Sequence, residues 1–528
     1  MRKPFWTYLA CCIAVFMIAM DNLIVTNALP VIRQALHTGL EGLEWTVNAY
    51  TMTFAVLLLT GAALGDRFGR RRLMLIGITV FTAGSAASAL APSIGALIAA
   101  RAVQGVGAAI TMPLTVTLIV SVTAPQRRGM ALGIWGATAG LGAALGPVIG
   151  GAVTDAASWQ WIFWINVPIG VVVLPLLLLA RESRSGAGRL DPAGVVLATA
   201  GLFGIVFGLV RGNSHGWTSA QVLGSLVGGG LLIVAFLAWE SRAATPMMPL
   251  SLFRSDGFSA ANATMLLTNM GMFGVIFLVS QFLQSVLGYT PLAAGVHGLP
   301  WTAAPAVTAP IAGLLADRVG GRRIVAIGVG LQAIGIAWLA TVITPTVHYA
   351  DLVPPFIIAG AGLGFFFAPI TQLTLRYAPG ELEGIASGTS NALRQVGTVL
   401  GVAVLGSVFS ATGGLGSPGQ FTAGLTNALA VSAAILGAAA LVVMLAPETQ
   451  AARQAKVPPQ RREYHDQLGS GHYRARVSQT PLREDGQSRV VPELPRPRGC
   501  WPRPGSSRVG PADPATSVVS EGPSISAT

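Results

Sequence analysis

The sequence GIWGATAGLGAALGPVIGG, from Gly133 to Gly151, is apolar and long enough to cross a lipid bilayer. At about 100° per residue, its glycines fall on two opposite faces of a helix. The first face carries Gly129, Gly133, Gly136 and Gly140, and the second carries Gly142, Gly146 and Gly150, next to Pro147 and Gly151. Each glycine costs a helix about 1 kcal/mol relative to alanine, so the stretch must gain something from them.

Two helix faces without side chains allow two neighbouring helices to approach the backbone closely. The pair Gly146-Pro147 also supplies a site at which the helix can bend. We therefore interpret this helix as a pivot between two moving halves of the protein. The spacing leaves open a second interpretation, in which the helix is tightly packed and has no mechanical role.

The composition identifies the class of protein. The chain has 528 residues, of which 52% are hydrophobic and only 10% charged, and its mean hydropathy is +0.64. Apolar runs of about 20 residues, each long enough for a hydrocarbon core of about 30 Å, recur along the chain. The sequence therefore predicts an all-α polytopic membrane protein, since a transmembrane barrel would show short alternating segments.

Fourteen transmembrane helices follow from the lengths of these runs. The predicted spans are 5–30, 45–64, 73–91, 93–120, 129–154, 161–180, 192–211, 220–239, 258–286, 292–316, 324–343, 352–375, 385–410 and 424–446. Because the number is even, both ends of the chain are expected on the same side of the membrane.

Arginines in the loops indicate which side this is. If the N-terminus is inside, the inner loops carry most of the loop arginines, whereas the outer loops hold little beyond Arg33 and Arg211. The inner loops lie at residues 67–72, 127–128, 181–189, 242–254 and 318–323. Positive loops stay in the cytoplasm, so we expect both termini there and the protein in the cytoplasmic membrane. The net charge of +12 lies in loops and in the C-terminal region rather than on one face, which argues against a nucleic-acid partner.

An internal repeat divides the chain. ALGDRFGRRR at 63–72 recurs as LLADRVGGRR at 314–323. The glycines Gly129, Gly133, Gly142 and Gly146 recur at one constant offset as Gly384, Gly388, Gly397 and Gly401. We expect six-helix bundles at 1–180 and 257–446, two inserted helices within 181–256, and a disordered cytoplasmic tail at 447–528.

Charged residues inside the spans are rare, and each costs about 2.5–3.5 kcal/mol at the bilayer centre on insertion scales. The clearest are the acid Asp21 and the cations Arg101 and Arg394. At ~1.5 Å per residue, Asp21 and Arg101 both lie about 12 Å below the outer surface, so they can pair. Burial favours the neutral acid and a guanidinium favours the carboxylate, which suits Asp21 to carry a proton. A fixed salt bridge between the first and fourth helices is the alternative.

Polar and aromatic residues in the spans are candidates for the lining of a central substrate cavity. The set is Asn22, Asn48, Tyr50, Gln104, Gln281, Gln284, Trp301, Phe366 and Arg394. Asparagine and glutamine at such positions also form ordinary hydrogen bonds between helices, worth about 0.6 kcal/mol each. The aromatic residues fit either an apolar or cationic ligand, or simple packing.

The two repeated loops combine an acid with several arginines at the ends of helices. We interpret them as a charge latch that breaks and reforms as the inner mouth opens, although ordinary membrane anchoring by arginines is the alternative. The latch residues are Asp66, Arg67, Gly69, Arg70 and Arg71 in the first copy and Asp317, Arg318 and Arg322 in the second.

Other chemistry finds no support in the sequence. Neither lysine, Lys3 or Lys456, lies in a phosphate-binding loop, which argues against ATP as the energy source. The scattered histidines and cysteines predict no metal site. The sequence shows no nucleophile, base and orienting group in a catalytic arrangement, so we do not expect an enzyme. No cofactor is expected, and a proton gradient remains as the energy source.

The motifs resemble those of the major facilitator superfamily, and within it the fourteen-helix drug:proton antiporters. The similar stretches are GDRFGRRR at 65–72, Arg101 with Gln104 and Gly105, the glycines of 133–151, WQWIFWINVPIG at 159–170, QFLQSVLGYTPLAAGVHGLP at 281–300 and RQVGTVLGVAVLG at 394–406. MDNLIVTNALPVI at 20–32 is similar to the helix-1 signature, with Leu23, Thr26 and Asn27 in place of the usual residues. The resemblance implies proton transfer through Arg101 and export through the glycine-rich fifth helix.

The resemblance therefore implies a proton-coupled antiporter that exports amphipathic drugs or antibiotics by alternating access. The span 292–316 has no acidic residue, which the resemblance associates with lipophilic monocations or neutral antibiotics rather than dications. A transporter of the same fold for a physiological metabolite is the main alternative, and a membrane-embedded enzyme or binding protein is a further one. We expect a monomer whose partners are small amphipathic substrates, protons and the lipid bilayer.

Overall fold

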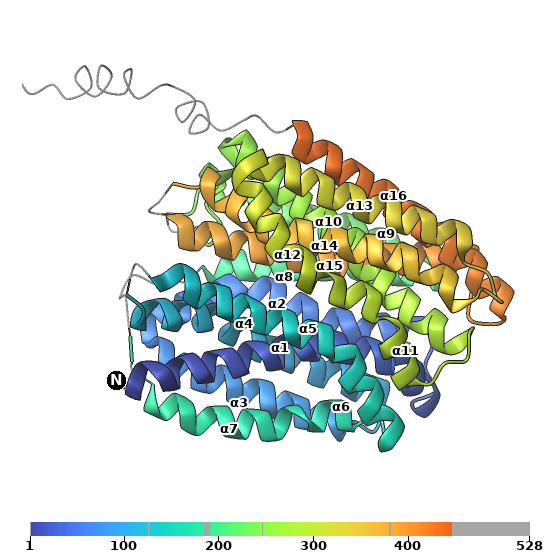
Figure 1. Cartoon of the computed structure of the whole chain (residues 1–528), viewed down its shortest axis with the longest axis horizontal. Helices are drawn as coiled ribbons and strands as arrows, with labels where there is room; N and C mark the ends of the chain where they lie inside the picture. Colours follow the sequence, from blue (N-terminus) through green and yellow to red (C-terminus); the bar gives the residue numbers. More distant parts are fainter. Residues whose placement is uncertain are drawn as a thin grey trace, which may run out of the picture. The chain divides into compact units, whose positions relative to one another are not determined.

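The computed structural model describes residues 2–124, 127–180, 182–183, 191–244, 246–379 and 382–445 (Figure 1). The predicted tail at 447–528 lies outside these residues. The first helices are α1 (Arg2–Ala35), α2 (Leu40–Phe68), α3 (Arg70–Ala89), α4 (Ile94–Val122), α5 (Arg128–Ala156), α6 (Trp161–Trp164), α7 (Asn166–Leu179), α8 (Pro192–His215) and α9 (Ala220–Glu240). The later ones are α10 (Asp256–Ser285), α11 (Pro291–His297), α12 (Leu299–Val319), α13 (Gly321–Val342), α14 (Tyr349–Tyr377), α15 (Glu383–Thr412) and α16 (Pro418–Leu445).

The all-α class and the count of fourteen spans are confirmed within the described ranges, where fourteen helical segments are long and apolar enough to cross a membrane. Each predicted span coincides with one helix or with a pair. The span 161–180 consists of α6 and α7, and the span 292–316 consists of α11 and α12.

The largest differences lie at the starts of α2 and α16 and at the end of α1, which continues to Ala35 rather than ending at 30. Helix α16 begins at Pro418 rather than at 424, because proline is well suited to the first turn of a helix. Helix α2 begins at Leu40 rather than at 45, directly after Gly39. Its first turns contain Glu41 and Glu44, which lower the local hydropathy and so moved the predicted start toward the apolar part.

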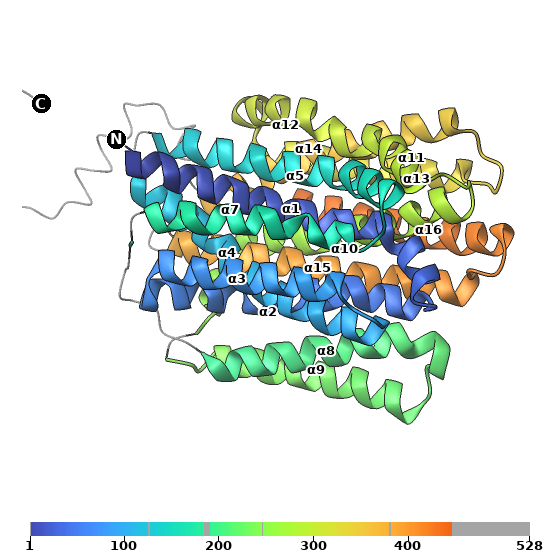
Figure 2. The same ribbon diagram turned by 90° about the horizontal axis from the view of Figure 1, so that it is seen from below.

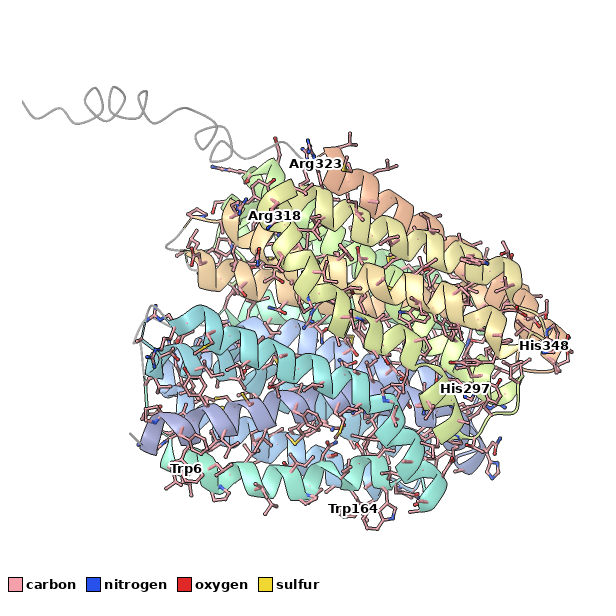
Figure 3. The ribbon with its side chains drawn as sticks, in the orientation of Figure 1. Trp6, Trp164, His297, Arg318, Arg323 and His348 are labelled. Carbon is pink, nitrogen blue, oxygen red and sulfur yellow. The ribbon has the colours of Figure 1, made fainter. Side chains whose placement is uncertain are left out.

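Two ends of the helical bundle are distinguished by their residues. Figure 3 shows Arg318 and Arg323 toward one end and His297 and His348 toward the other. We call the first the basic end, because the arginines of the repeated loops lie there, and the second the far end. The loops after α2 and α12 are at the basic end, and the loops after α1 and α10 are at the far end.

One glycine face of α5 packs against α1. A Cβ atom at Gly142 would lie 2.6 Å from the carbonyl oxygen of Phe16, and one at Gly146 would lie 3.0 Å from that of Met20. Only glycine permits this approach. In the second half of the chain, Gly397 and Gly401 of α15 likewise face the carbonyl oxygens of α10. The sequence repeat therefore corresponds to a repeated helix contact.

The other glycine face of α5 is occupied only near the far end. Gly151 lies 18 residues after Gly133 and so on the same face, at about 100° per residue. It lies against Leu292 of α11, whose Cα is 2.6 Å from the position that a Cβ atom would take. Toward the basic end, no atom lies within 4 Å of the Cβ positions of Gly133, Gly136 or Gly140. The expectation of two packed faces is thus wrong for this part of α5, which is parted from the second half of the chain (Figure 1).

The pair α8 and α9 packs together through glycines and contacts the rest of the bundle through α8 (Figure 2). Nε of Arg211 in α8 lies 2.9 Å from Oε1 of Glu41 in α2. Nδ2 of Asn213 donates to the carbonyl oxygen of Ser407 in α15 over 2.5 Å. Helix α8 therefore contacts α2 and α15, one from each copy of the repeat, near the far end.

The α1–α5 contact generates a first prediction. Gly142→Ala should lower the melting temperature of the protein, because overpacking a tight contact costs about 1–3 kcal/mol. The measurement is the fraction that remains monodisperse in size-exclusion chromatography after heating in detergent. The matched control is Gly136→Ala, which has open space around it and should leave the melting temperature unchanged or slightly raised. Equal losses in both variants would contradict the proposed contact.

Candidate functional site

The predicted pair of Asp21 and Arg101 is present. Asp21 lies on α1 and Arg101 on α4, and Nη1 of Arg101 is 2.7 Å from Oδ2 of Asp21. The exposed fraction is 0% for Asp21 and 1% for Arg101, so both charges are removed from solvent and lipid. The equal depth expected from helix rise therefore corresponds to direct contact.

Two amide side chains complete the partners of the carboxylate. Nε2 of Gln104 and Nδ2 of Asn166 each donate to Oδ1 of Asp21 over 2.8 Å. Asn166 also donates to Ser85 Oγ on α3, over 3.1 Å, which links the carboxylate to two further helices. Asn166 and Ser85 were not predicted, and the signal for Asn166 was an amide side chain in the middle of the apolar stretch at 159–170.

Arg101 has other acceptors besides the carboxylate. Its Nη1 donates to Oε1 of Gln104 over 2.8 Å, and its Nε donates to the carbonyl oxygen of Thr46 over 3.4 Å. The guanidinium carbon lies 4.2 Å from the centre of the Tyr50 ring and 5.7 Å from that of Phe163. Such aromatic faces attract a cation.

Polar contacts between the two halves of the chain gather around Asn27 at the far end. Nδ2 of Asn27 donates to the carbonyl oxygens of Pro147, over 2.9 Å, and Pro291, over 2.7 Å. Its backbone oxygen accepts from Nε2 of Gln284 over 2.7 Å. Asn27 therefore joins α1, α5, α10 and the start of α11. It was noted only as a departure from the helix-1 signature, and its polarity was the signal.

A small cavity of about 60 Å³ adjoins this cluster and is lined by Asn27, Ser280, Trp301 and Phe356, among others. A larger groove of about 670 Å³ lies between α2, α4 and α8, with Trp45, Phe203 and Phe207 in its wall. Of the predicted cavity residues, only Trp301 lines either space.

The other predicted cavity residues have diverse surroundings. Asn22 is half-buried, and Asn48 is fully buried with no hydrogen-bond partner among the described residues. Gln281 donates to the carbonyl oxygen of Phe277 in its own helix over 3.4 Å. Phe366 is completely buried in the core formed with α13 and α16. These four residues are not brought together into one site.

Arg394 is half-buried on α15, and its Nε has no hydrogen-bond partner within the described ranges. The same helix contacts α2 through Gly388 and α10 through Gly397. At about 100° per residue, Arg394 lies on the side between these two contacts and away from α8. Its role as a cavity residue stays a prediction.

The first repeated loop is held within its own half. Arg70 pairs with Asp66 over 2.8 Å, one turn apart. Arg71 reaches Glu182, whose Oε1 accepts from the Arg71 backbone N–H over 3.0 Å, and so ties the loop to the end of α7. The guanidinium of Arg67 lies 5.2 Å from the Phe68 ring centre.

The turns of the two repeated loops share an unusual backbone conformation. Gly69 has φ 113° and Gly320 has φ 100°, a region that favours glycine, so both copies turn in the same way. Figure 3 places Arg318 at the end of α12, next to this second turn. The side chain of Asp317 lies outside the described residues, and the latch role of both copies, Arg322 included, stays a prediction.

The family follows from a match to a known model. Residues 11–402 and 261–482 match the model of the Major Facilitator Superfamily. The chain belongs to the major facilitator superfamily. This confirms the superfamily that the motifs resembled, and with the apolar helices it makes the chain a multi-pass membrane protein.

Relatives within the superfamily carry names of drug resistance and export. The chain is 37% identical over 414 residues to the multidrug resistance protein Stp of Mycobacterium tuberculosis, covering 78% of this chain and 76% of the relative. It is 35% identical over 407 residues to the tetracenomycin C resistance and export protein of Streptomyces glaucescens, covering 76% of each. With the cephamycin export protein CmcT of Amycolatopsis lactamdurans it shares 37% over 448 residues, covering 83% of this chain and 91% of the relative.

Solved structures of the superfamily share the fold. A bacterial homologue of the human lysosomal transporter Spinster, in an inward-facing and unoccupied conformation, has a TM-score of 0.60 at 17% identity, covering 84% of this chain and 97% of that one. The xylose transporter XylE of E. coli, in a partially occluded inward-open conformation, has a TM-score of 0.57 at 14% identity, covering 85% and 99%.

The buried pair generates a second prediction. Arg101→Met should destabilise the protein by about 3–5 kcal/mol, because it leaves the Asp21 carboxylate buried without its cation. The double variant Asp21→Asn with Arg101→Met should recover much of this loss. Melting temperatures of the wild type, both single variants and the double variant form a double-mutant cycle that measures the coupling. Additive effects of the two substitutions would show that the charges do not stabilise each other.

Proposed function

We propose that this chain is a proton-coupled antiporter that exports amphipathic drugs or antibiotics across the cytoplasmic membrane by alternating access. The names of its relatives support drug export as the direction and the cargo class. By the positive-inside rule, the basic end and both termini lie in the cytoplasm. No cofactor takes part, and the chain works as a monomer.

The observation that carries the proton role is the pattern of hydrogen bonds around Arg101. Protonation of Asp21 removes the attraction that holds the guanidinium. Arg101 then retains the oxygen of Gln104 and the carbonyl oxygen of Thr46 as acceptors. The same packing therefore accommodates both states of the acid without leaving the cation unsatisfied. A pair that served only as a fixed link between α1 and α4 would also need these acceptors, because a guanidinium has five N–H donors, so the transport of Asp21→Asn decides between the two roles.

Alternating access explains the asymmetric packing of α5. The far end is joined by the hydrogen bonds of Asn27, while the glycines of α5 near the basic end have no neighbours. In this arrangement the cytoplasmic side receives cargo. Helix α5 then acts as the pivot on which the two halves rock, and the Asn27 cluster must part before cargo leaves on the outside.

The proton gradient supplies enough energy. Each charge that moves inward gains about 2.3 kcal/mol per 100 mV of membrane potential. A tenfold gradient of a neutral cargo costs about 1.4 kcal/mol, so one proton per cycle covers it. Proton binding at Asp21 from outside favours release of the cargo and return of the empty carrier.

The proton role gives the third prediction. Asp21→Asn should abolish efflux driven by a pH gradient, because the amide cannot exchange a proton. The measurement is the uptake of a fluorescent amphipathic dye into proteoliposomes after an imposed pH jump. Asp256→Asn, which removes an exposed acid at the start of α10, is the matched control and should pump like wild type. Normal pH-driven flux in Asp21→Asn would assign the proton to another group.

The cargo class is tested separately. Expression in a drug-hypersensitive host should raise tolerance to some members of a broad panel of dyes and antibiotics. Unchanged tolerance to the whole panel would favour the alternative of a physiological metabolite as the cargo.

A further inference from the structure

A second buried acid lies on α2, outside the site of Asp21. Glu44 has an exposed fraction of 3%, although it lies only about 6 Å from the start of the helix at ~1.5 Å per residue. None of the described residues forms an ion pair or a hydrogen bond with its side chain. Glu44 was not among the predicted intramembrane acids, because the predicted span began one residue after it.

The Glu44 side chain bridges the two copies of the repeat. Its Oε1 occupies the space that a side chain at Gly406 of α15 would take. Helix α2 belongs to the first copy of the repeat and α15 to the second, and the two helices pack together. Because residue 406 is glycine, the carboxyl group fits between the helices with only backbone opposite it. The carboxyl group is therefore buried by closure of this interface.

The charged groups around Glu44 do not neutralise it. Glu41, one turn away on α2, carries the same sign. Arg211 of α8 is engaged with Glu41 over 2.9 Å, and Arg101 of α4 is engaged with Asp21. The part of α15 that faces this region, residues 399–412, contains no charged residue. No cation thus approaches Glu44 from α2, α4, α8 or α15.

A buried carboxylate without a cation or a donor is far more costly than a buried neutral acid, which therefore forms instead. We propose that Glu44 is a second proton-binding site, which takes up a proton from the solution at the far end before α2 and α15 close and releases it when they part. The reaction is protonation of the carboxylate by hydronium, with water as the other product. This inference rests on the alternating access of the proposed function but not on drugs being the cargo.

Glu44 and Asp21 then have opposite roles in the closed state. Asp21 has a cation and two amide donors, so its ionised form is satisfied where it is buried. Glu44 has neither, so closure of the far end requires its neutral form. External protons would in this way drive closure of the outer side, independently of the proton that Asp21 exchanges.

The test is a distance across the far end as a function of pH. Spin labels are placed on cysteines that replace Gly39 and Thr412, both exposed, in a full-length chain whose native cysteines are replaced by serine. The protein is in lipid nanodiscs without drug. Wild type should change from a short to a long distance as the pH rises from about 5 to about 9, a range that covers carboxyl groups shifted by burial.

Glu44→Gln should keep the short distance over the whole range, because the amide is always neutral. Asp351→Asn, which removes an exposed acid at the start of α14 at the same end of the bundle, is the matched control and should respond to pH like wild type. A wild-type distance that does not change with pH would overturn the proposal, and so would a Glu44→Gln variant that responds like wild type. Since no transport is measured, failure of drug efflux would contradict the proposed function and leave this result unaffected.

A measurement on the unsubstituted chain covers the case in which Glu44→Gln does not fold. Dicyclohexylcarbodiimide reacts with protonated carboxyl groups in apolar surroundings. Mass spectrometry of the labelled protein should find the adduct on Glu44 at low pH and its loss at high pH, with Glu41 unlabelled at both. Absence of the adduct from Glu44 at low pH, or equal labelling of Glu41, would count against the neutral acid at the interface.

Discussion

The ion pair between Asp21 and Arg101 constrains the first half of this transporter. Two charges that are almost completely buried require every hydrogen-bonding group around them to be placed correctly. Five helices supply those groups, since α1, α2, α3, α4 and α7 contribute Asp21, Thr46, Ser85, Arg101 and Asn166 to one network. The network both holds these helices together and places a carboxyl group where its charge controls packing.

Closure of the far end depends on interactions of a different kind. Asn27 satisfies carbonyl groups of α5 and α11, and glycines allow those helices to approach without side chains between them. Hydrogen bonds to backbone oxygens are lost and regained without creating a buried charge, which suits an interface that opens in every cycle. Glu44 adds a proton requirement on the neighbouring interface of α2 and α15. The two acids therefore act on different parts of the motion.

The inserted helices lie where the two halves of the chain meet. Helix α8 pairs with α2 through Arg211 and Glu41 and with α15 through Asn213 and Ser407 (Figure 2). Its Arg211 is paired with Glu41, one turn from Glu44 on α2. The insertion thus contributes to the electrostatic surroundings of the interface as well as to its packing.

The sequence by itself determined the fold class, the number of spans, the repeat and the depth of the charged residues. Helix length and hydropathy are local properties, and the rise per residue converts a position into a depth. The sequence could therefore place Asp21 and Arg101 at one level and identify Gly142 and Gly146 as a face for close contact.

Only the tertiary structure decided which faces of the helices meet. The depth of a residue in the membrane does not say which way its helix face points or which helix lies beside it. The contact of Asn166 with Asp21 was therefore not predicted. Phe366, predicted to line the cavity, lies in the core. The bare face of α5 was expected to be packed, but whether a neighbour approaches it depends on how the two halves are tilted. The hydropathy pattern also could not indicate that Glu44 is buried, because its carboxyl group packs against Gly406, more than 300 residues later in the chain. Burial is a property of the assembled helices, and it is burial that gives each of these acids its chemistry.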